Sequence, residues 1–202
     1  MIDLEKAPAL LRNAAHALDQ AFSGDGAPAP FPDLRQAARQ SFEALGLPTT
    51  KHEAWKYTDL RPALAPEYAL ADATATVGAD VVAKAAIDGF DAARVVLVNG
   101  RFDADQSDLS GLPAGVRVGS LREAALADAA TLADYFGRYA DVERDAFAAL
   151  NASFDLDGLF LLVPRGVAVE RPIHVVHVAT ADRPTFVQSR HLLVVGEVAQ
   201  AT

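Results

Sequence analysis

Two histidines, His174 and His177, are the first residues whose type suggests chemistry, because imidazole is a common ligand for zinc and other transition metals. The stretch from Ile173 to Val178 has the β-branched composition of a strand, and strand side chains alternate between two faces. Side chains three positions apart therefore point to opposite sides of a sheet and do not converge on one ion. We predict that both are structural polar residues. Whether His191 joins one of them across strands is left open by the sequence.

Carboxylates suggest a second chemistry, the general acid–base hydrolysis of glycosides, with Asp155, Asp157 and Glu170 as candidates. That reaction needs two carboxyls at a set separation across a cleft, and no spacing here indicates such a pair. A calcium loop starting at Asp103 fails, because Asp108 occupies the position that requires glycine. There is no G-x-S-x-G motif, no phosphate-binding loop and no cysteine to ligate a metal cluster. We predict no catalytic, cofactor-binding or metal-binding residue in this chain.

The only tryptophan lies in the segment 47–60, where Trp55, Lys56, Tyr57 and Thr58 follow one another. Two aromatic faces beside a cation could bind a partner. Aromatic side chains more often fill a core, so the favoured interpretation is that Trp55 and Tyr57 anchor a short helix. If this chain has a partner surface, however, these four residues are where we expect it.

The composition excludes several classes of protein. The chain has 202 residues, of which 51% are hydrophobic and 22% charged, which is typical of a globular protein rather than a disordered one. Its net charge of −9 gives no electrostatic basis for binding nucleic acid or an anionic membrane. Without cysteine, a signal peptide pattern or an apolar run of membrane-spanning length, it is expected to be soluble and cytoplasmic.

The N-terminal part is expected to be helical. Apolar residues at steps of three and four predict a helix over 4–18, followed by a turn-rich linker at 23–30. A second helix over 34–45 would be capped by Asp33 and stopped by Gly46. Its inward face would carry Leu34, Ala38, Phe42 and Leu45.

A third, short helix is predicted through Trp55, opened by a capping box of Thr50 with Glu53 and ending by Pro62. After a weakly patterned region at 63–91, the run 94–98 reads as a strand, and Asn99-Gly100 is a strong hairpin signal. The further elements are a strand at 115–118, a helix from a Ser120–Glu123 capping box to about residue 130, a helix at 132–139 and one capped by Asp141.

Beyond residue 154 the pattern becomes β-type, with runs at 159–163, 173–178 and 190–195. No helix separates these runs, so they do not form βαβ units. They suit a sandwich, a barrel or the first rungs of a β-solenoid, and the sequence leaves that choice open. The alternation continues to Thr202, which we interpret as the mark of a fragment. A carbohydrate-binding or carbohydrate-active β-solenoid remains the alternative function.

Several segments resemble SufD, of the SufB/SufD family of iron–sulfur cluster assembly scaffolds. The resemblance covers most of the chain and is most specific at Trp55-Lys56-Tyr57-Thr58. The segments that carry it are Leu47 to Leu60, Val98 to Phe102, Leu150 to Phe154 with Asp157 to Val167, Glu170 to His174, and Ser189 to Leu192.

The resemblance implies an α+β fold: a mostly helical N-terminal domain with a small hairpin over 1–150, then the first strands of a right-handed parallel β-helix over 151–202. It implies a non-catalytic scaffold subunit, which pairs with a SufB-like paralogue and a SufC-like ATPase through regions mostly outside this chain. The iron–sulfur cluster would be handled by the full complex, and no cofactor would be bound by this part.

Overall fold

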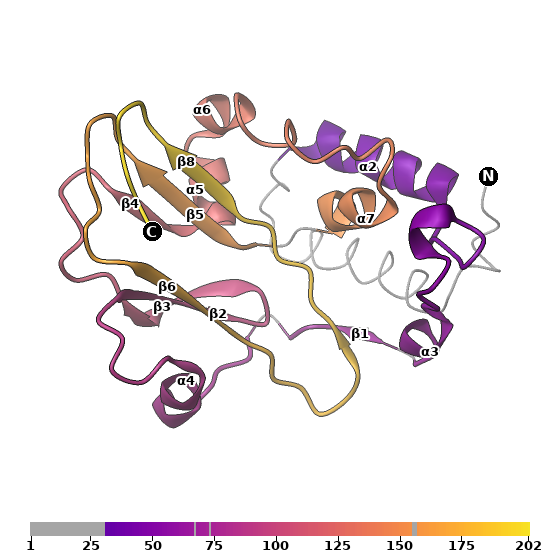
Figure 1. Ribbon diagram of the computed structural model, residues 1–202, viewed down its shortest axis with the longest axis horizontal. Helices are drawn as coiled ribbons and strands as arrows, with labels where there is room; N and C mark the ends of the chain where they lie inside the picture. The colour runs from indigo at the N-terminus through magenta and orange to yellow at the C-terminus, as the bar shows by residue number, and fades with distance from the viewer. Residues whose placement is uncertain (1–30, 67, 73, 155–156) are drawn as a thin grey trace. The chain divides into compact units, whose positions relative to one another are not determined.

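The computed structural model describes residues 31–66, 68–72, 74–154 and 157–202 (Figure 1). The predicted helix over 4–18 and the linker at 23–30 lie outside these residues. The chain divides into two compact units, the first made of Met1–Ala71, Gly137–Phe154 and Ala181–Phe186, the second of Asp72–Phe136, Asp155–Thr180 and Val187–Thr202. Both units draw on sequence from either side of residue 150, and the predicted domain boundary there remains a prediction.

The described residues form a mixed α/β structure with small sheets. The helices are α2 (Pro32–Leu45), the 3₁₀ helix η1 (Glu53–Trp55), α3 (Arg61–Leu64), α4 (Ala79–Ala85), α5 (Leu121–Ala127), α6 (Ala129–Ala133) and α7 (Ala146–Phe154). The strands are β1 (Ala69–Leu70), β2 (Ala93–Val98), β3 (Arg101–Asp108), β4 (Arg117–Ser120), β5 (Leu159–Val163), β6 (Ile173–Val178), β7 (Thr185–Phe186) and β8 (Leu192–Val195).

In the first unit, α2 begins at Pro32, two residues before the predicted start. Its N-cap is Phe31, with φ 52°, and Pro32 occupies the first turn, where a missing N–H costs nothing. Asp33 therefore lies inside the first turn and is not the cap, although its charge there suits the helix dipole. Gly46 ends the helix as predicted, with φ 65° and its N–H donated to the Phe42 carbonyl.

The buried face of α2 centres on Ala38 and Phe42, as predicted, and α2 packs along α7 (Figure 1). Leu45 does not join that face, since it is exposed in the last turn. The first unit also contains a short parallel pair, β1 with β7, in which Ala69 lies opposite Thr185.

The helices before β5 are shorter than predicted because aspartates interrupt them. Ser120 caps α5 as expected, accepting the Glu123 N–H at 3.0 Å. Asp128 ends α5 and caps α6 by accepting the Thr131 N–H at 3.2 Å, so the predicted helix to about residue 130 is divided. The helix predicted over 132–139 is confirmed only to residue 133, and the prediction was wrong beyond it, where the chain forms turns.

The cap of α7 is Asp145 rather than Asp141. The Asp145 carboxylate accepts the N–H groups of Phe147 and Ala148, each at 2.8 Å, which is the N-cap arrangement. Asp141 instead accepts the Glu143 N–H in the turn before the helix.

The Asn99-Gly100 hairpin between β2 and β3 is confirmed, with φ angles of 49° and 81°. The Asn99 side chain is buried: its amide group donates to the Thr180 carbonyl at 3.0 Å and its oxygen accepts the Thr180 N–H at 2.9 Å. β3 is longer than the short return predicted, running from Arg101 to Asp108.

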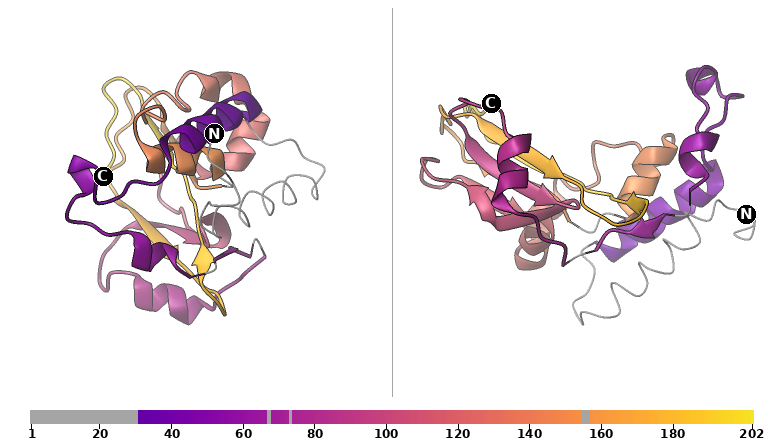
Figure 2. Two further views of the ribbon diagram at one scale, coloured as in Figure 1. Left: turned by 90° about the vertical axis from the view of Figure 1, so that its right-hand side faces the viewer. Right: turned by 90° about the horizontal axis from the view of Figure 1, so that it is seen from below.

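In the second unit, two three-stranded sheets each combine one antiparallel and one parallel pairing. Their orders are β3-β2-β6 and β4-β5-β8, with β2 parallel to β6 and β5 parallel to β8. β5 and β8 lie side by side in Figures 1 and 2. The inner strand β2 is buried on both faces, which explains its nearly continuous apolar sequence. One face packs with Val82 of α4, and the other packs with Leu159.

The register between β5 and the segment around β8 is constant. Asp157 lies opposite Ser189, Phe160 opposite Leu192, Val163 opposite Val195 and Ala168 opposite Gln200, and every one of these pairs is parallel. The offset is 32 residues at each position (189 − 157, 192 − 160, 195 − 163 and 200 − 168). Residues 189–200 thus retrace the path of residues 157–168 in the same direction.

Candidate functional site

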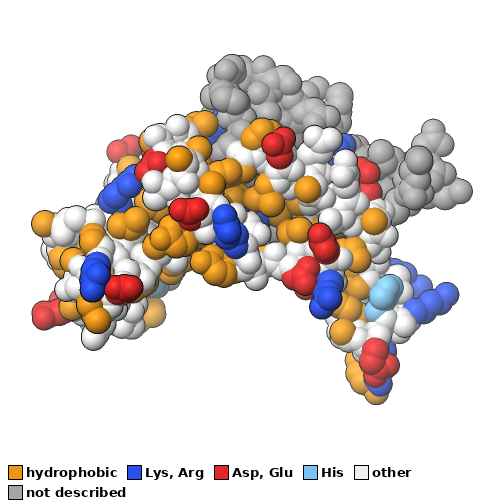
Figure 3. Space-filling model, turned by 90° about the horizontal axis from the view of Figure 1, so that it is seen from above, with side chains coloured by type: hydrophobic (Ala, Val, Ile, Leu, Met, Phe, Trp, Pro, Cys, Tyr) orange, Lys and Arg blue, Asp and Glu red, His pale blue; other side chains and the backbone are white. Residues whose placement is uncertain are grey.

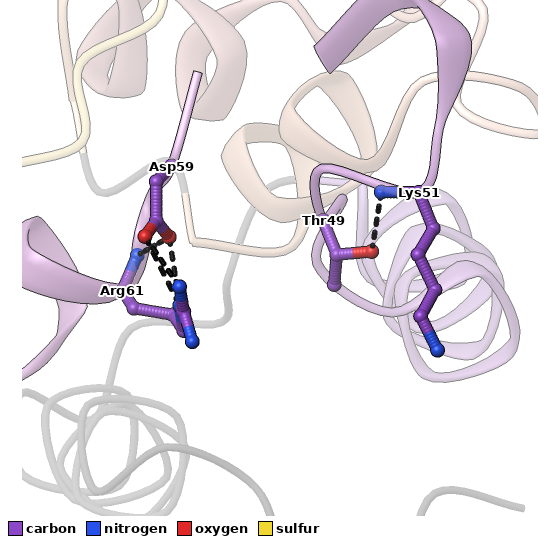
Figure 4. Close-up of polar contacts among 4 residues, drawn as sticks. All are labelled: Thr49, Lys51, Asp59 and Arg61. Atoms are coloured by element: carbon purple, nitrogen blue, oxygen red, sulfur yellow. Dashed lines mark hydrogen bonds and ion pairs between the residues drawn. The ribbon is translucent and has the colours of Figure 1, made fainter. Parts of the chain in front are cut away.

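The segment 47–60, here called the signature lobe, is held by short local hydrogen bonds. His52 accepts the Thr49 N–H on its Nδ1 at 3.0 Å, and its carbonyl accepts the Trp55 N–H at 2.8 Å. Lys51 donates its backbone N–H to the Thr49 hydroxyl at 3.3 Å (Figure 4). The predicted capping box of Thr50 with Glu53 was wrong, because η1 has His52 as its N-cap and no side-chain cap.

The lobe leads into an ion pair at its C-terminal end. Asp59 accepts the Arg61 backbone N–H at 3.0 Å and the guanidinium Nη2 at 2.7 Å (Figure 4). Hydrogen bonding from the Arg61 side chain, and then from its backbone, holds the pKa of Asp59 below its ordinary value. The short helix predicted through Trp55 is η1, which ends before Pro62 as expected. Pro62 itself lies in the first turn of α3, where proline is tolerated.

The four signature residues Trp55 to Thr58 separate into one anchor and three exposed side chains. Trp55 is half-buried, and its ring packs against Phe147 of α7 with centroids 5.2 Å apart. Tyr57 is 90% exposed, so the interpretation that it anchors the core was wrong. Lys56 places its ammonium 5.0 Å from the Tyr57 ring centroid and 2.5 Å from a Glu53 carboxylate oxygen. The partner surface predicted for these residues stays a prediction.

A second constellation, here called the coil junction, joins residues 157–159 to 189–191 in the second unit. Asp157 is buried and its carboxylate accepts three hydrogen bonds: from the Ser120 hydroxyl at 2.8 Å, the Arg122 N–H at 3.1 Å and the Phe102 N–H at 3.2 Å. Its backbone carbonyl accepts the Arg190 N–H at 3.1 Å. The carboxylate therefore ties β3, β4 and α5 to the start of β5.

The coil junction leaves no general acid–base pair of the kind that a glycosidase needs. Asp157 has its oxygens engaged by three donors, and Glu170 is exposed on a loop after β5. Asp155 lies outside the described residues. Figure 3 shows acidic, basic and apolar side chains interspersed on the face it presents, with no large area of one charge sign.

Comparison with known proteins identifies the family. Residues 13–175 match the family model of the SufBD protein N-terminal region. The chain belongs to the SufBD family. It is 30% identical over 174 residues to a protein of Synechocystis sp. described as an iron–sulfur cluster assembly SufBD family protein. That match covers 83% of this chain and 37% of the relative, so the chain spans little more than a third of the relative's length.

In this SufBD family member the two histidines of β6 have different neighbours. The His174 ring meets Phe90 at 5.8 Å between centroids, whereas the His177 ring meets His191 at 5.2 Å. The pairing across strands that the sequence left open thus involves His177. Among the residues that the structure describes, no three metal-ligating side chains converge.

The protonation of His191 also bears on metal binding. Its Nδ1 accepts the Leu159 backbone N–H at 2.9 Å, so in the neutral ring the proton is on Nε2. Neither nitrogen of His191 then offers a free lone pair to a metal. Burial lowers the pKa of His191 and the nearby His177 lowers it further, while the Asp157 carboxylate acts in the opposite direction.

The residues of the coil junction could not be recognised as one unit from the sequence. Ser120 was predicted only as a helix cap, and Asp157 was considered only as a candidate acid–base carboxylate beside Asp155 and Glu170. The two lie 37 residues apart, so no local spacing could have connected them.

In the part of the SufBD family chain that the structure describes, none of the helices combines the length and the apolar character that crossing a bilayer requires.

Proposed function

We propose that this chain is the N-terminal part of a SufD-like scaffold subunit that supports iron–sulfur cluster assembly without catalysing a reaction. The observation that carries the proposal is the family membership over residues 13–175, combined with the constant parallel register of residues 157–168 and 189–200. A scaffold of this kind works by presenting a rigid, extended surface, and repeated parallel coils build such a surface.

The register supports a parallel β-helix as the core of the scaffold. A solenoid stacks successive coils at a constant offset, so that side chains at equivalent positions lie above one another. Leu161 and Val163 are buried in the described core, while their register partners Leu193 and Val195 are exposed. In the proposed β-helix a further coil would pair with β8 and cover those side chains. The right-handed sense is part of the proposal and agrees with the general preference of parallel crossovers.

We propose that this chain does not catalyse a reaction, because its candidate catalytic side chains already make structural hydrogen bonds. Asp157, the most buried carboxylate among the described residues, accepts hydrogen bonds from three donors that hold the fold together. The His191 ring is committed to the Leu159 N–H. We propose that no cofactor is bound by this part of the protein, and that the iron–sulfur cluster is carried by the full complex. The proposed location is the cytoplasm.

The proposed partners are a SufB-like paralogue and a SufC-like ATPase, engaged mostly through regions outside this chain. The signature lobe is the proposed contact on the described part. Tyr57 supports this, because a rigid aromatic side chain is a frequent anchor of protein interfaces. The Thr58 N–H donates to the Trp55 carbonyl at 2.9 Å, and this bond holds the backbone on both sides of Tyr57. Little backbone conformational entropy would therefore be lost on binding.

The test is native mass spectrometry of the endogenous protein, captured through an N-terminal tag on its own gene. Recovery of the gene product with a SufB-like subunit and an ATPase supports the scaffold role. Recovery without any such partner, under conditions that preserve other complexes of the same cells, refutes it.

A matched pair of variants tests the lobe separately. Tyr57→Ala removes the 90% exposed ring of the lobe, whereas Tyr139→Ala removes a ring that is 78% exposed elsewhere in the same unit. We expect Tyr57→Ala alone to reduce the recovered partner by about tenfold, the loss of a modest hot spot. Equal recovery with both variants would leave the scaffold role standing and remove the lobe from it.

A further inference from the structure

The coil junction is a place where two stretches of backbone touch closely. The Arg190 N–H donates to the Asp157 carbonyl at 3.1 Å, and Asp157 pairs with Ser189 in parallel register. A Cβ at Gly158 would collide with the Arg190 carbonyl, lying 2.6 Å from its carbon. A side chain does not fit at this position, so the two backbones lie directly against each other beside Leu159.

The neighbouring hydrogen bond depends on the charge of one side chain. Leu159 opens β5, and its N–H donates to Nδ1 of His191 at 2.9 Å. Only a neutral imidazole has a lone pair to accept that bond, because the imidazolium carries hydrogens on both nitrogens. A proton from solvent that binds Nδ1 would replace the bond with two N–H groups facing each other.

The groups around His191 oppose its protonation. The His177 ring on β6 lies 5.2 Å away between centroids, and a positive charge on one ring repels a charge on the other. The Asp157 carboxylate attracts a charge on His191, but Ser120, Arg122 and Phe102 donate to its oxygens. These are the two titratable groups that act on the ring, and with its burial their combined effect is to lower the pKa of His191.

We propose that His191, with His177 beside it, is an acid-sensitive latch of the coil junction: the neutral ring holds Leu159 and His191 together, and protonation releases them. Release would free the start of β8 from β5 and expose the edge of the sheet. The latch concerns contacts within this chain alone, so it stands or falls independently of the proposed scaffold role.

The direction of the pH dependence follows from linkage. An opened junction separates His191 from the groups around it, so that its imidazole titrates at about 6.5, whereas the closed junction lowers the pKa. The open state therefore binds more protons than the closed state as the pH falls below about 6.5. Closed junctions are favoured above that pH, and opening increases below it.

Amide hydrogen exchange of the wild-type chain, read at Leu159 by NMR and corrected for the intrinsic pH dependence, measures the opening directly. Between pH 7.5 and 5.5 we expect Leu159 exchange to rise at least about threefold, while the Ala93 amide, bonded to the Pro172 carbonyl, stays unchanged. Long-range ¹H–¹⁵N spectra should find the His191 proton on Nε2 at pH 7.5. Leu159 protection that does not change with pH, or a proton on Nδ1, would overturn the latch.

Three variants distinguish a latch from a merely structural ring. His191→Asn keeps an oxygen near the Nδ1 position but does not titrate, so the exchange of Leu159 should lose its pH dependence. His177→Gln removes the repelling neighbour, which should raise the pKa of His191 and weaken the pH dependence. His174→Asn is the matched control, because His174 lies elsewhere on β6 and its ring contacts Phe90 rather than His191. This variant should behave like wild type. If His191→Asn retains the full pH dependence, another group titrates and the proposal fails.

Discussion

The substitution Gly158→Ala is expected to be among the most destabilising single-methyl additions in this chain. The new Cβ would clash with the Arg190 carbonyl oxygen and lie 3.0 Å from the Arg190 nitrogen. These are backbone atoms of a neighbouring segment, which cannot rotate away as a side chain does. Gly158 does not have positive φ, so the cost comes from the close approach of the segments rather than from backbone conformation.

The magnitude follows from the contacts that must separate. Moving the segments apart breaks the Arg190–Asp157 backbone bond and the Leu159–His191 bond, each worth about 1 kcal/mol. Repacking around an inserted methyl group typically costs a further 1–3 kcal/mol or so. The free energy of unfolding should therefore fall by about 3–5 kcal/mol, a large part of the roughly 5–15 kcal/mol of a typical domain.

Two glycines provide graded controls. No heavy atom lies within 4 Å of a Cβ at Gly119, and that residue also lacks positive φ, so Gly119→Ala should change the stability by less than about 1 kcal/mol. A Cβ at Gly196 would lie 2.6 Å from the Arg165 nitrogen and 3.0 Å from its Cα, so Gly196→Ala should fall between the two.

Urea unfolding followed by far-ultraviolet circular dichroism measures these differences. Tryptophan fluorescence is unsuitable, because Trp55 lies in the first unit and Gly158 in the second. If Gly158→Ala does not yield folded protein while Gly119→Ala does, the ranking still holds. A Gly158→Ala variant within about 1 kcal/mol of wild type would show that the two segments are not in contact as described.

Three further predictions concern single side chains. Asp157→Asn places an amide N–H₂ against one of three donors and should lower the free energy of unfolding by about 1–3 kcal/mol in urea titrations; no change would mean that the carboxylate is not buried among them. Trp55→Ala should cost about 1–2 kcal/mol and Tyr57→Ala less than about 0.5 kcal/mol by the same assay, and the reverse order would contradict their assigned exposure. Hydrogen bonding from Thr131 lowers the pKa of Asp128, so its contribution to the free energy of unfolding is complete above a pH of about 3.9 and is lost as the pH falls through the folded pKa. Asp128→Ala should therefore reduce the loss of stability that urea midpoints show between pH 5 and 2.5. An unaltered pH profile would refute the cap.

Features that depend on neighbours a few positions apart could be predicted from the sequence. The Asn99-Gly100 turn, the Ser120 cap on the Glu123 N–H and the end of α2 at Gly46 are confirmed, because each is a local requirement of backbone geometry or hydrogen bonding. The same local reasoning misplaced three helix N-caps: Asp33 instead of Phe31, Thr50 instead of His52, and Asp141 instead of Asp145. Asp141 and Asp145 both accept backbone N–H groups near the start of α7, so their residue type does not distinguish them.

Contacts between residues far apart in the chain could not be predicted and are known only from the folded structure. Asp157 meets partners 37 and 55 residues away. Trp55 packs its ring against Phe147 of α7, whereas Tyr57 is exposed. The offset of 32 residues between the segments around β5 and β8 could not be counted from so few strands. Strand composition predicts that a segment will pair, but the choice of partner and register is made by the packing of both faces of the sheet, which is a property of the folded chain.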